Sequence, residues 1–211
     1  MSSAYGSIVA PQFDSSKISS ILPICKETKS GMLIEIAMVN NNSPIPLISH
    51  LHQIFSKVIE EGTSYPQEFE LDEQEFREYF LSHHAFVALK AKDKSTNGVV
   101  WDERVVGMFY IKPNYPGRCS HICNGGFIVP HKSRNLGVGK AMGEAFLQLA
   151  PAIGYKSSVF NLVFANNVAS VNLWKSLNFV EIGRVPKAAR LQGYEELVEA
   201  IVFYKDFETD V

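Results

Sequence analysis

The spacing of apolar residues along the chain predicts a series of amphipathic helices. From Pro46 to Glu61 the apolar residues recur every three or four positions, as they do on the buried face of a helix. Asp72, followed three residues later by Glu75, has the spacing of a capping box and predicts a helix that runs through Phe80. The same periodicity predicts later helices at Gly137–Ile153 and Ala169–Leu177.

Short apolar or alternating runs between these helices predict the strands of a sheet. We expect strands at Met32–Met38, His84–Ala91, Arg104–Lys112, Cys119–Val129, Ser158–Phe164, Val180–Val185 and Val198–Tyr204. The loop Asp93–Glu103, which contains Asn97-Gly98, has the character of a hairpin connection. Helices at the start, a meander in the middle and a strand–helix–strand crossover at the end predict an α/β fold of the α+β type, with a mixed, twisted sheet and flanking helices.

Composition fits one domain and argues against several kinds of partner. The 211 residues are 46% hydrophobic, enough for a substantial core, and no linker divides them. We therefore expect a single domain at residues 31–211 after a poorly defined N-terminal segment, residues 1–30. A net charge of −2 offers no basic surface to nucleic acid or an anionic membrane, and no apolar run approaches the roughly 20 residues of a spanning helix. Three cysteines without a secretory leader favour a reducing compartment, so we expect a cytoplasmic protein, with a mitochondrial location as the alternative.

The segment from Arg134 to Lys140 combines the features of a phosphate-binding turn. It follows an apolar strand and precedes a helix, and Gly137 and Gly139 allow the backbone to approach an anion closely. Unpaired N–H groups at the start of the helix would point at that anion, while Arg134 and Lys140 add positive charge. The expected ligand is the pyrophosphate of a nucleotide-like molecule.

Four interpretations of this turn are open. A GxxxxGK[ST] loop would need a glycine five residues before Gly139 and a hydroxyl at Ala141, and the chain has neither. A dinucleotide fingerprint would need an acidic residue near Val159, which lies in an apolar run. An ordinary glycine-rich turn without a ligand is the third interpretation. The fourth is the signature [R/Q]-x-x-G-x-[G/A], which Arg134, Gly137 and Gly139 match in register.

A second segment, Asn167–Phe179, follows the next predicted strand and matches the pattern N-x-x-[A/S]-x-x-L-[Y/W]-x-x-L-G-F at most positions. With both motifs in this order, the chain resembles the GCN5-related N-acetyltransferases. Trp174 stands where many members of that family carry a tyrosine that protonates the departing thiolate, so the identity of the acid is open. Asn178 replaces the usual glycine, and asparagine tolerates the left-handed conformation that ends a helix.

This resemblance implies an acetyl-CoA-dependent N-acetyltransferase that uses no metal. It also implies a splayed central pair of strands, ending at Val129 and Phe164, that receives the pantetheine arm. A strand N–H near Val129 would polarise the thioester carbonyl. The residues expected to bind acetyl-CoA are Val129, Arg134, Asn135, Leu136, Gly137, Val138, Gly139, Lys140 and Asn167.

From Ser64 to the C-terminus the chain shows a narrower resemblance. Strings such as Phe109–Tyr115 and Phe160–Phe164 are similar to those of the fungal L-azetidine-2-carboxylate N-acetyltransferases. That resemblance implies acetylation of toxic proline analogues, and of pyrroline-5-carboxylate or its open semialdehyde, in detoxification and protection from oxidative stress. It places substrate contacts on Asn124 and Asn161, and it implies a homodimer.

The nitrogen of such a substrate must lose a proton before it can react. A cyclic amine with a pKa of about 10.4 is deprotonated in roughly one molecule per thousand at neutral pH, so supplying the free amine costs about 4–5 kcal/mol. The strands predicted beside the cleft carry no carboxylate, and the odd offset between His121 and Asn124 would place them on opposite faces. We therefore expect Asn124 to be the catalytic residue by orienting the amine, with a water accepting the proton, and Asn161 to bind the substrate carboxylate.

The sequence leaves two other functions open. The chain could acetylate another small amine, such as a polyamine, or bind acetyl-CoA without catalysis.

Cys119, His121 and Cys123 alternate along one predicted strand and could face one metal ion. Zinc normally takes four ligands, however, and no second Cys/His pair lies at a conventional spacing, so we expect packing residues and no metal.

Overall fold

One mixed sheet organises the computed structural model, which describes residues 15–91 and 100–208. Its strands are β1 Ile24–Glu27, β2 Leu33–Val39, β3 His84–Lys90, β4 Val105–Pro113, β5 Ile122–Ile128, β6 Ser157–Phe164, β7 Val180–Ala189 and β8 Val198–Asp206. The helices are α1 Ser15–Ile21, α2 Ile45–Glu61, α3 Glu73–Phe80, α4 Trp101–Arg104, α5 Val138–Ile153 and α6 Val168–Ser176, with short 3-10 turns η1 Gly117–Cys119 and η2 His131–Ser133.

The strand order is β1-β2-β3-β4-β5-β6-β8-β7. Within the described sheet, β5 and β6 run parallel and all other neighbours run antiparallel. The parallel pair is joined by α5, as expected for strands that need a crossover connection. This arrangement confirms the predicted mixed α/β fold with flanking helices.

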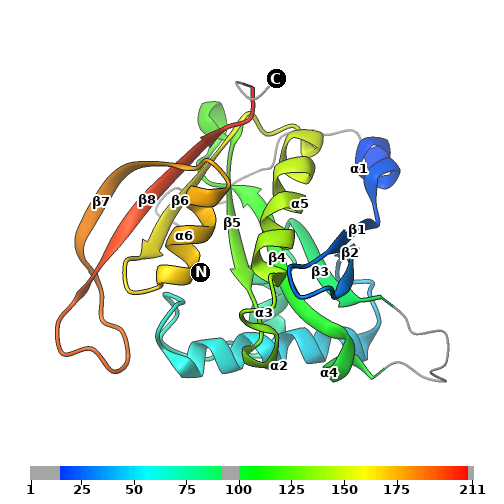
Figure 1. Cartoon of the computed structure of the whole chain (residues 1–211), viewed down its shortest axis with the longest axis horizontal. Helices are drawn as coiled ribbons and strands as arrows, with labels where there is room; N and C mark the ends of the chain where they lie inside the picture. The colour runs from blue at the N-terminus through cyan, green and yellow to red at the C-terminus, as the bar shows by residue number, and fades with distance from the viewer. Residues whose placement is uncertain (1–14, 92–99, 209–211) are drawn as a thin grey trace.

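Helices cover both faces of the sheet (Figure 1). In β3, Phe86 and Ala88 pack into the same core as α5, whereas Ala85 and Val87 pack into the core that contains α2 and α3. Alternate residues of a strand point to opposite faces, so a strand buried on both sides is apolar at nearly every position. In Figure 1, α5 lies between α1 and α6, and α2 runs along one end of the molecule.

The capping box predicted at the start of α3 is confirmed. The Asp72 side chain accepts a hydrogen bond from the Glu75 backbone N–H at 2.8 Å, and the Glu75 side chain accepts one from the Asp72 N–H at 3.0 Å. These reciprocal bonds satisfy N–H groups that the first turn of a helix leaves without partners.

The N-terminal part of the sheet differs from the sequence interpretation. Residues 1–30 were expected to lie outside the domain, but α1 and β1 belong to this segment, and β1 pairs with β2 along its whole length. The boundary drawn at residue 31 therefore falls inside a hairpin. Residues 1–14 lie outside the described residues.

The strand predicted at Cys119–Val129 begins later than expected. A turn that includes η1 occupies its first part, because Gly117 has a φ of 56° and the Cys119 N–H bonds to the Pro116 carbonyl at 3.1 Å. Cys119 and His121 are therefore exposed, and β5 starts at Ile122.

The connection between β3 and β4 also contains a feature that the sequence did not predict. Its final residues form the short helix α4, and the Asn97-Gly98 pair lies outside the described residues. No helix within residues 15–91 and 100–208 is long and apolar enough to span a bilayer.

His84, at the start of β3, should make the stability of the fold depend on pH. Burial disfavours the charged imidazolium and lowers the pKa of His84 to about 4, from 6.5. The unfolded chain therefore binds more protons as the pH falls from 6.5 to 4, so the stabilisation present above pH 6.5 is lost across this window. We expect His84→Gln to flatten the dependence of unfolding free energy on pH, measured by urea unfolding. His121→Gln, at an exposed position in the turn before β5, is the control, and an unchanged slope in His84→Gln would contradict the assignment.

Candidate active site

A cavity of about 750 Å³ lies where β5 and β6 diverge. The two strands pair at Ile122–Ser157 and Cys123–Ser158 and then separate, so the backbone of each beyond these pairs faces the opening. Residues from the starts of α5 and α6, and from the segment 63–66, complete the lining. The predicted splayed strand pair is therefore present.

The turn before α5 has the geometry of an anion site. Asn135 and Gly137 have φ values of 63° and 91°. Among the described residues, no side chain caps the helix, which begins at Val138. The first N–H groups of a helix lack intrahelical partners and carry its positive dipole end. Of the residues expected to bind acetyl-CoA, Leu136 alone is absent from the cavity lining; its side chain packs against the core under α5, and its carbonyl accepts a bond from Ser30 Oγ.

The charge of Arg134 suggests a contact with the phosphates, but its side chain is engaged within the protein. Its guanidinium pairs with Glu61 at the end of α2, with 2.6 Å between Nη2 and Oε2, and its Nε donates to the Val129 carbonyl at 3.2 Å. Arg134 therefore ties the turn to β5 and α2, and its charge is balanced. The exposed cations of the lining are Lys140 and Lys29, the second of which comes from the turn between β1 and β2.

Asparagines meet at the inner end of the cavity. Asn114 Oδ1 accepts from Asn124 Nδ2 at 3.2 Å and from Asn161 Nδ2 at 2.6 Å, and Asn114 Nδ2 donates to Asn161 Oδ1 at 3.1 Å. The structure thus brings the predicted substrate residues Asn124 and Asn161 together through Asn114, which the sequence interpretation did not assign. Each amide nitrogen of Asn124 and Asn161 has a second hydrogen beyond these bonds, and both residues line the cavity.

An irregularity in β6 accompanies the position of Asn161. The register between β6 and β8 shifts between Phe160 and Val163, so Asn161 and Leu162 lie outside the regular ladder. Bulges of this kind redirect side chains and are common beside functional sites. On the other side of the cluster, Asn124 is the cross-strand partner of Lys112, whose Nζ lies 4.2 Å from the ring centroids of both Tyr79 and Tyr110.

Tyrosines close the same end of the cavity. The hydroxyls of Tyr79 and Tyr110 lie 3.1 Å apart, and a Cβ at Gly126 would lie 2.5 Å from the Tyr65 hydroxyl and from the Tyr110 ring. A glycine is therefore required at position 126. Burial raises the pKa of Tyr65 and of Tyr110 well above 10, so both phenols stay protonated near neutral pH and cannot act as bases.

Ordinary general bases are not found among the described residues that line the cavity, which include no Asp, Glu or His. His121 is exposed in the turn before β5 and does not belong to the lining. Cys123 is buried, and burial raises the pKa of its thiol, so it is not a nucleophile. Within residues 15–91 and 100–208, no group of His, Cys, Asp and Glu side chains is arranged to hold a metal ion.

The second motif lies on α6. Asn167 caps this helix, because its side chain accepts from the Ser170 N–H at 3.1 Å. Trp174 is 3% exposed, and its ring centroid lies 4.7 Å from that of Phe127 and 4.5 Å from that of Phe160. The residue that replaces the tyrosine of many acetyltransferases is therefore a packed core residue at the edge of the cavity.

Comparisons with known proteins agree with this geometry. The sequence model of the acetyltransferase (GNAT) family matches residues 55–179. The chain is 42% identical over 168 residues to N-acetyltransferase aca1 of Schizosaccharomyces pombe, covering 76% of this chain and 80% of that protein. A GCN5-related N-acetyltransferase from Kribbella flavida has a similar fold, with a TM-score of 0.70, 24% identity, and coverage of 82% of this chain and 97% of that one.

A further similar structure is that of a GNAT superfamily phosphinothricin acetyltransferase from Sinorhizobium meliloti, solved in complex with AcCoA. It aligns with a TM-score of 0.66 and 15% identity over 81% of this chain and 88% of that one, which shows likeness of fold. The family match covers more than half of the sequence, and the yeast relative is matched over most of its length. The chain therefore belongs to the acetyltransferase (GNAT) family and is an N-acetyltransferase.

Proposed function

We propose that this N-acetyltransferase transfers the acetyl group of acetyl-CoA to the nitrogen of a small cyclic imino acid, such as L-azetidine-2-carboxylate or pyrroline-5-carboxylate in its ring or open form. The observation that carries the proposal is the uncharged asparagine cluster at the inner end of the cavity. The second amide hydrogens of Asn124 and Asn161, and the remaining lone pair on each of their oxygens, suit a molecule that combines a carboxylate with a ring nitrogen.

The mouth of the cavity fits the phosphates of acetyl-CoA. The unpaired N–H groups at the start of α5 would bind the pyrophosphate, and Lys29 and Lys140 would add positive charge to the same region. Asn167 and the widening gap between β5 and β6 would receive the pantetheine arm. Acetyl-CoA supplies the activated acetyl group, and the residues of this chain position it.

Catalysis here depends more on positioning the ring nitrogen and the thioester than on a side chain that abstracts the proton. Asn124 orients the ring nitrogen while a water accepts its proton, since the described lining offers no carboxylate or imidazole. Asn161 binds the substrate carboxylate, and a backbone N–H at Val129 stabilises negative charge on the thioester oxygen. The Asn114 side chain fixes Asn124 and Asn161 relative to one another.

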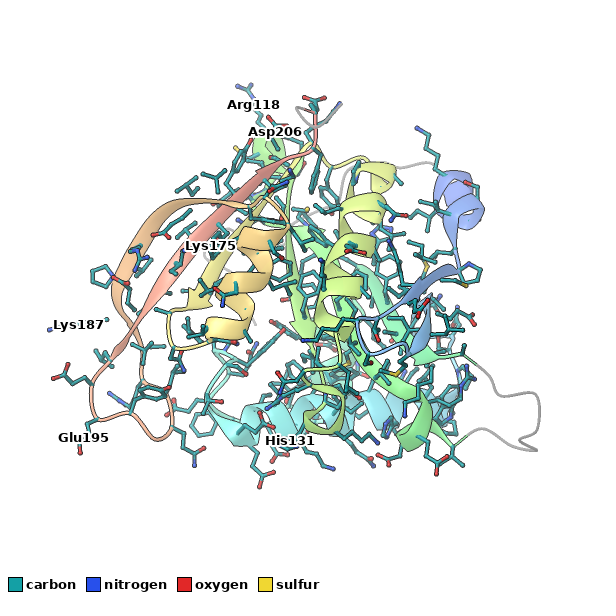
Figure 2. All side chains as sticks on the ribbon, viewed as in Figure 1. Arg118, His131, Lys175, Lys187, Glu195 and Asp206 are labelled. Carbon is teal, nitrogen blue, oxygen red and sulfur yellow. The ribbon has the colours of Figure 1, made fainter. Side chains whose placement is uncertain are left out.

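The charge of the cavity disfavours a polyamine as the acceptor. Polyamines carry several positive charges at neutral pH and would be bound best by acidic side chains. The charged residues of the described lining are Lys29, Arg134 and Lys140. Glu195, in the loop between β7 and β8, is an acidic residue outside this lining. Its side chain points away from the body of the molecule, as does that of Lys187 in β7 (Figure 2).

The proposal is tested by thiol release from acetyl-CoA with azetidine-2-carboxylate, proline and spermidine offered in parallel. We expect turnover with azetidine-2-carboxylate. Turnover with spermidine alone would keep the enzyme class and remove the imino acid assignment. Acetyl-CoA binding without release of thiol in any reaction would instead favour an untested amine or a module that has lost catalysis.

A further inference from the structure

A hydrogen bond on α6 joins two residues of the cavity lining. Trp174 Nε1 donates to Ser170 Oγ over 3.0 Å, one helical turn away. The indole is held on its other sides by Phe127, Phe160 and Phe179, with ring centroids 4.5–5.3 Å from its own. Because Trp174 is fixed in the core, this bond also fixes the position of the Ser170 oxygen.

The direction of this bond leaves the Ser170 hydroxyl hydrogen for another acceptor. An indole nitrogen can only donate, so the Ser170 oxygen is the acceptor. Serine in a helix commonly donates to the carbonyl four residues earlier, which here belongs to Asn166. Across residues 15–91 and 100–208, neither this bond nor any other hydrogen bond donated by Ser170 Oγ is present, whereas Ser176 Oγ on the same helix donates to the Leu173 carbonyl at 2.7 Å.

We propose that the Ser170 hydroxyl donates a hydrogen bond to the sulfur of CoA and stabilises the departing thiolate, with Trp174 as its positioning residue. The inference rests on the proposed use of acetyl-CoA. As the acetyl carbon bonds to the amine nitrogen, the carbon–sulfur bond breaks and its electron pair stays on sulfur. The amine proton goes to water, and the thiolate later takes a proton from solvent, so the serine keeps its own.

The chemistry of these side chains separates their roles. Hydrogen bonds from a hydroxyl to an anion are stronger than those between neutral groups, so Ser170 favours the product thiolate over the thioester. Trp174 cannot replace it, because its single N–H is already bonded to Ser170. A rival donor in the same lining is Asn167, whose side-chain oxygen is engaged as the helix cap but whose amide nitrogen is not part of that bond.

The test is the pKa of the CoA thiol in the binary complex, followed through thiolate ultraviolet absorbance against pH. This measurement needs no acceptor amine. We expect Ser170→Ala to raise the pKa of the bound thiol by about 1, since one hydrogen bond to a charged group corresponds to roughly tenfold or more in an equilibrium. Trp174→Phe should produce part of this rise, and Ser170→Thr should restore the wild-type value. Ser176→Ala is the matched control, since its hydroxyl already has a partner within α6.

Kinetics give a second readout. We expect Ser170→Ala to lower kcat about tenfold with little change in KM for acetyl-CoA, because the lost bond acts on the leaving group. Equal thiol pKa values in Ser170→Ala and Ser176→Ala would overturn the inference while leaving the proposed function standing. A rise confined to Asn167→Ala would also overturn it, in favour of Asn167 as the donor. A protein that binds no CoA would overturn both the inference and the proposed function.

Discussion

Replacing Asn124 with alanine is expected to reduce kcat at least about tenfold while the protein remains folded. The side chain is half-buried and holds its position through a 3.2 Å bond to Asn114 and a 2.8 Å bond from the Gly125 N–H. If it orients the amine, its loss removes the alignment between the nitrogen and the thioester without removing core volume. Steady-state kinetics with the best acceptor from the thiol-release assay, together with thermal unfolding, measure the two effects separately.

Variants of the neighbouring asparagines distinguish the role of Asn124 from theirs. Asn161→Ala should mainly raise KM for the acceptor, since Asn161 is proposed to bind the carboxylate. Asn114→Ala should lower kcat and raise KM together, because both other asparagines donate to the Asn114 oxygen. Asn42→Ala, at an exposed position before α2, is the control for asparagine loss alone. Wild-type turnover in Asn124→Ala would remove Asn124 from the mechanism.

Features whose causes lie within one segment could be predicted from the sequence. The capping box at Asp72 and Glu75 is a contact between residues three positions apart, and the turn before α5 depends on glycine at its own position. The nearly continuous apolar run that buries both faces of β3 is likewise a local pattern. These local patterns predicted the order of the elements from β2 onward, apart from α4, and they predicted a glycine-containing turn between β5 and α5.

Features that depend on tertiary contacts could not be predicted in the same way. The charge of Arg134 is balanced by Glu61, which lies 73 residues earlier in the chain. Asn114 reaches Asn161 across 47 residues, and no local pattern indicates which asparagines will meet. Lys29 was missed because it belongs to the N-terminal segment that the apolar pattern left outside the domain. His121 stays outside the cavity that Asn124 lines, as predicted, but the reason differs, because the turn that includes Gly117 leaves His121 exposed before the start of β5.

Replacing Gly137 with alanine is expected to weaken acetyl-CoA binding and to lower the free energy of unfolding by about 1–3 kcal/mol. Gly137 has a φ of 91°, a conformation that side chains with a Cβ rarely adopt, and a Cβ there would lie 2.9 Å from the backbone nitrogen of Lys29. To relieve this contact, the turn between β1 and β2 must move away from the start of α5. The change would thus displace Lys29 and the turn before α5 together, so stability and binding should fall in the same variant.

Gly139→Ala separates backbone strain from the mere addition of a methyl group. Gly139 lies inside α5, and a Cβ there would meet its nearest neighbour, Leu173 Cδ2, at 3.5 Å, which is an ordinary contact. Alanine also favours a helix more than glycine does, so the stability of this variant should match or exceed that of the wild type. Urea unfolding and acetyl-CoA titration calorimetry on both variants measure the difference. Equal stability in the two variants would show that the turn relaxes without cost, whereas tight acetyl-CoA binding by an unstable Gly137→Ala protein would place the phosphates elsewhere than at the start of α5.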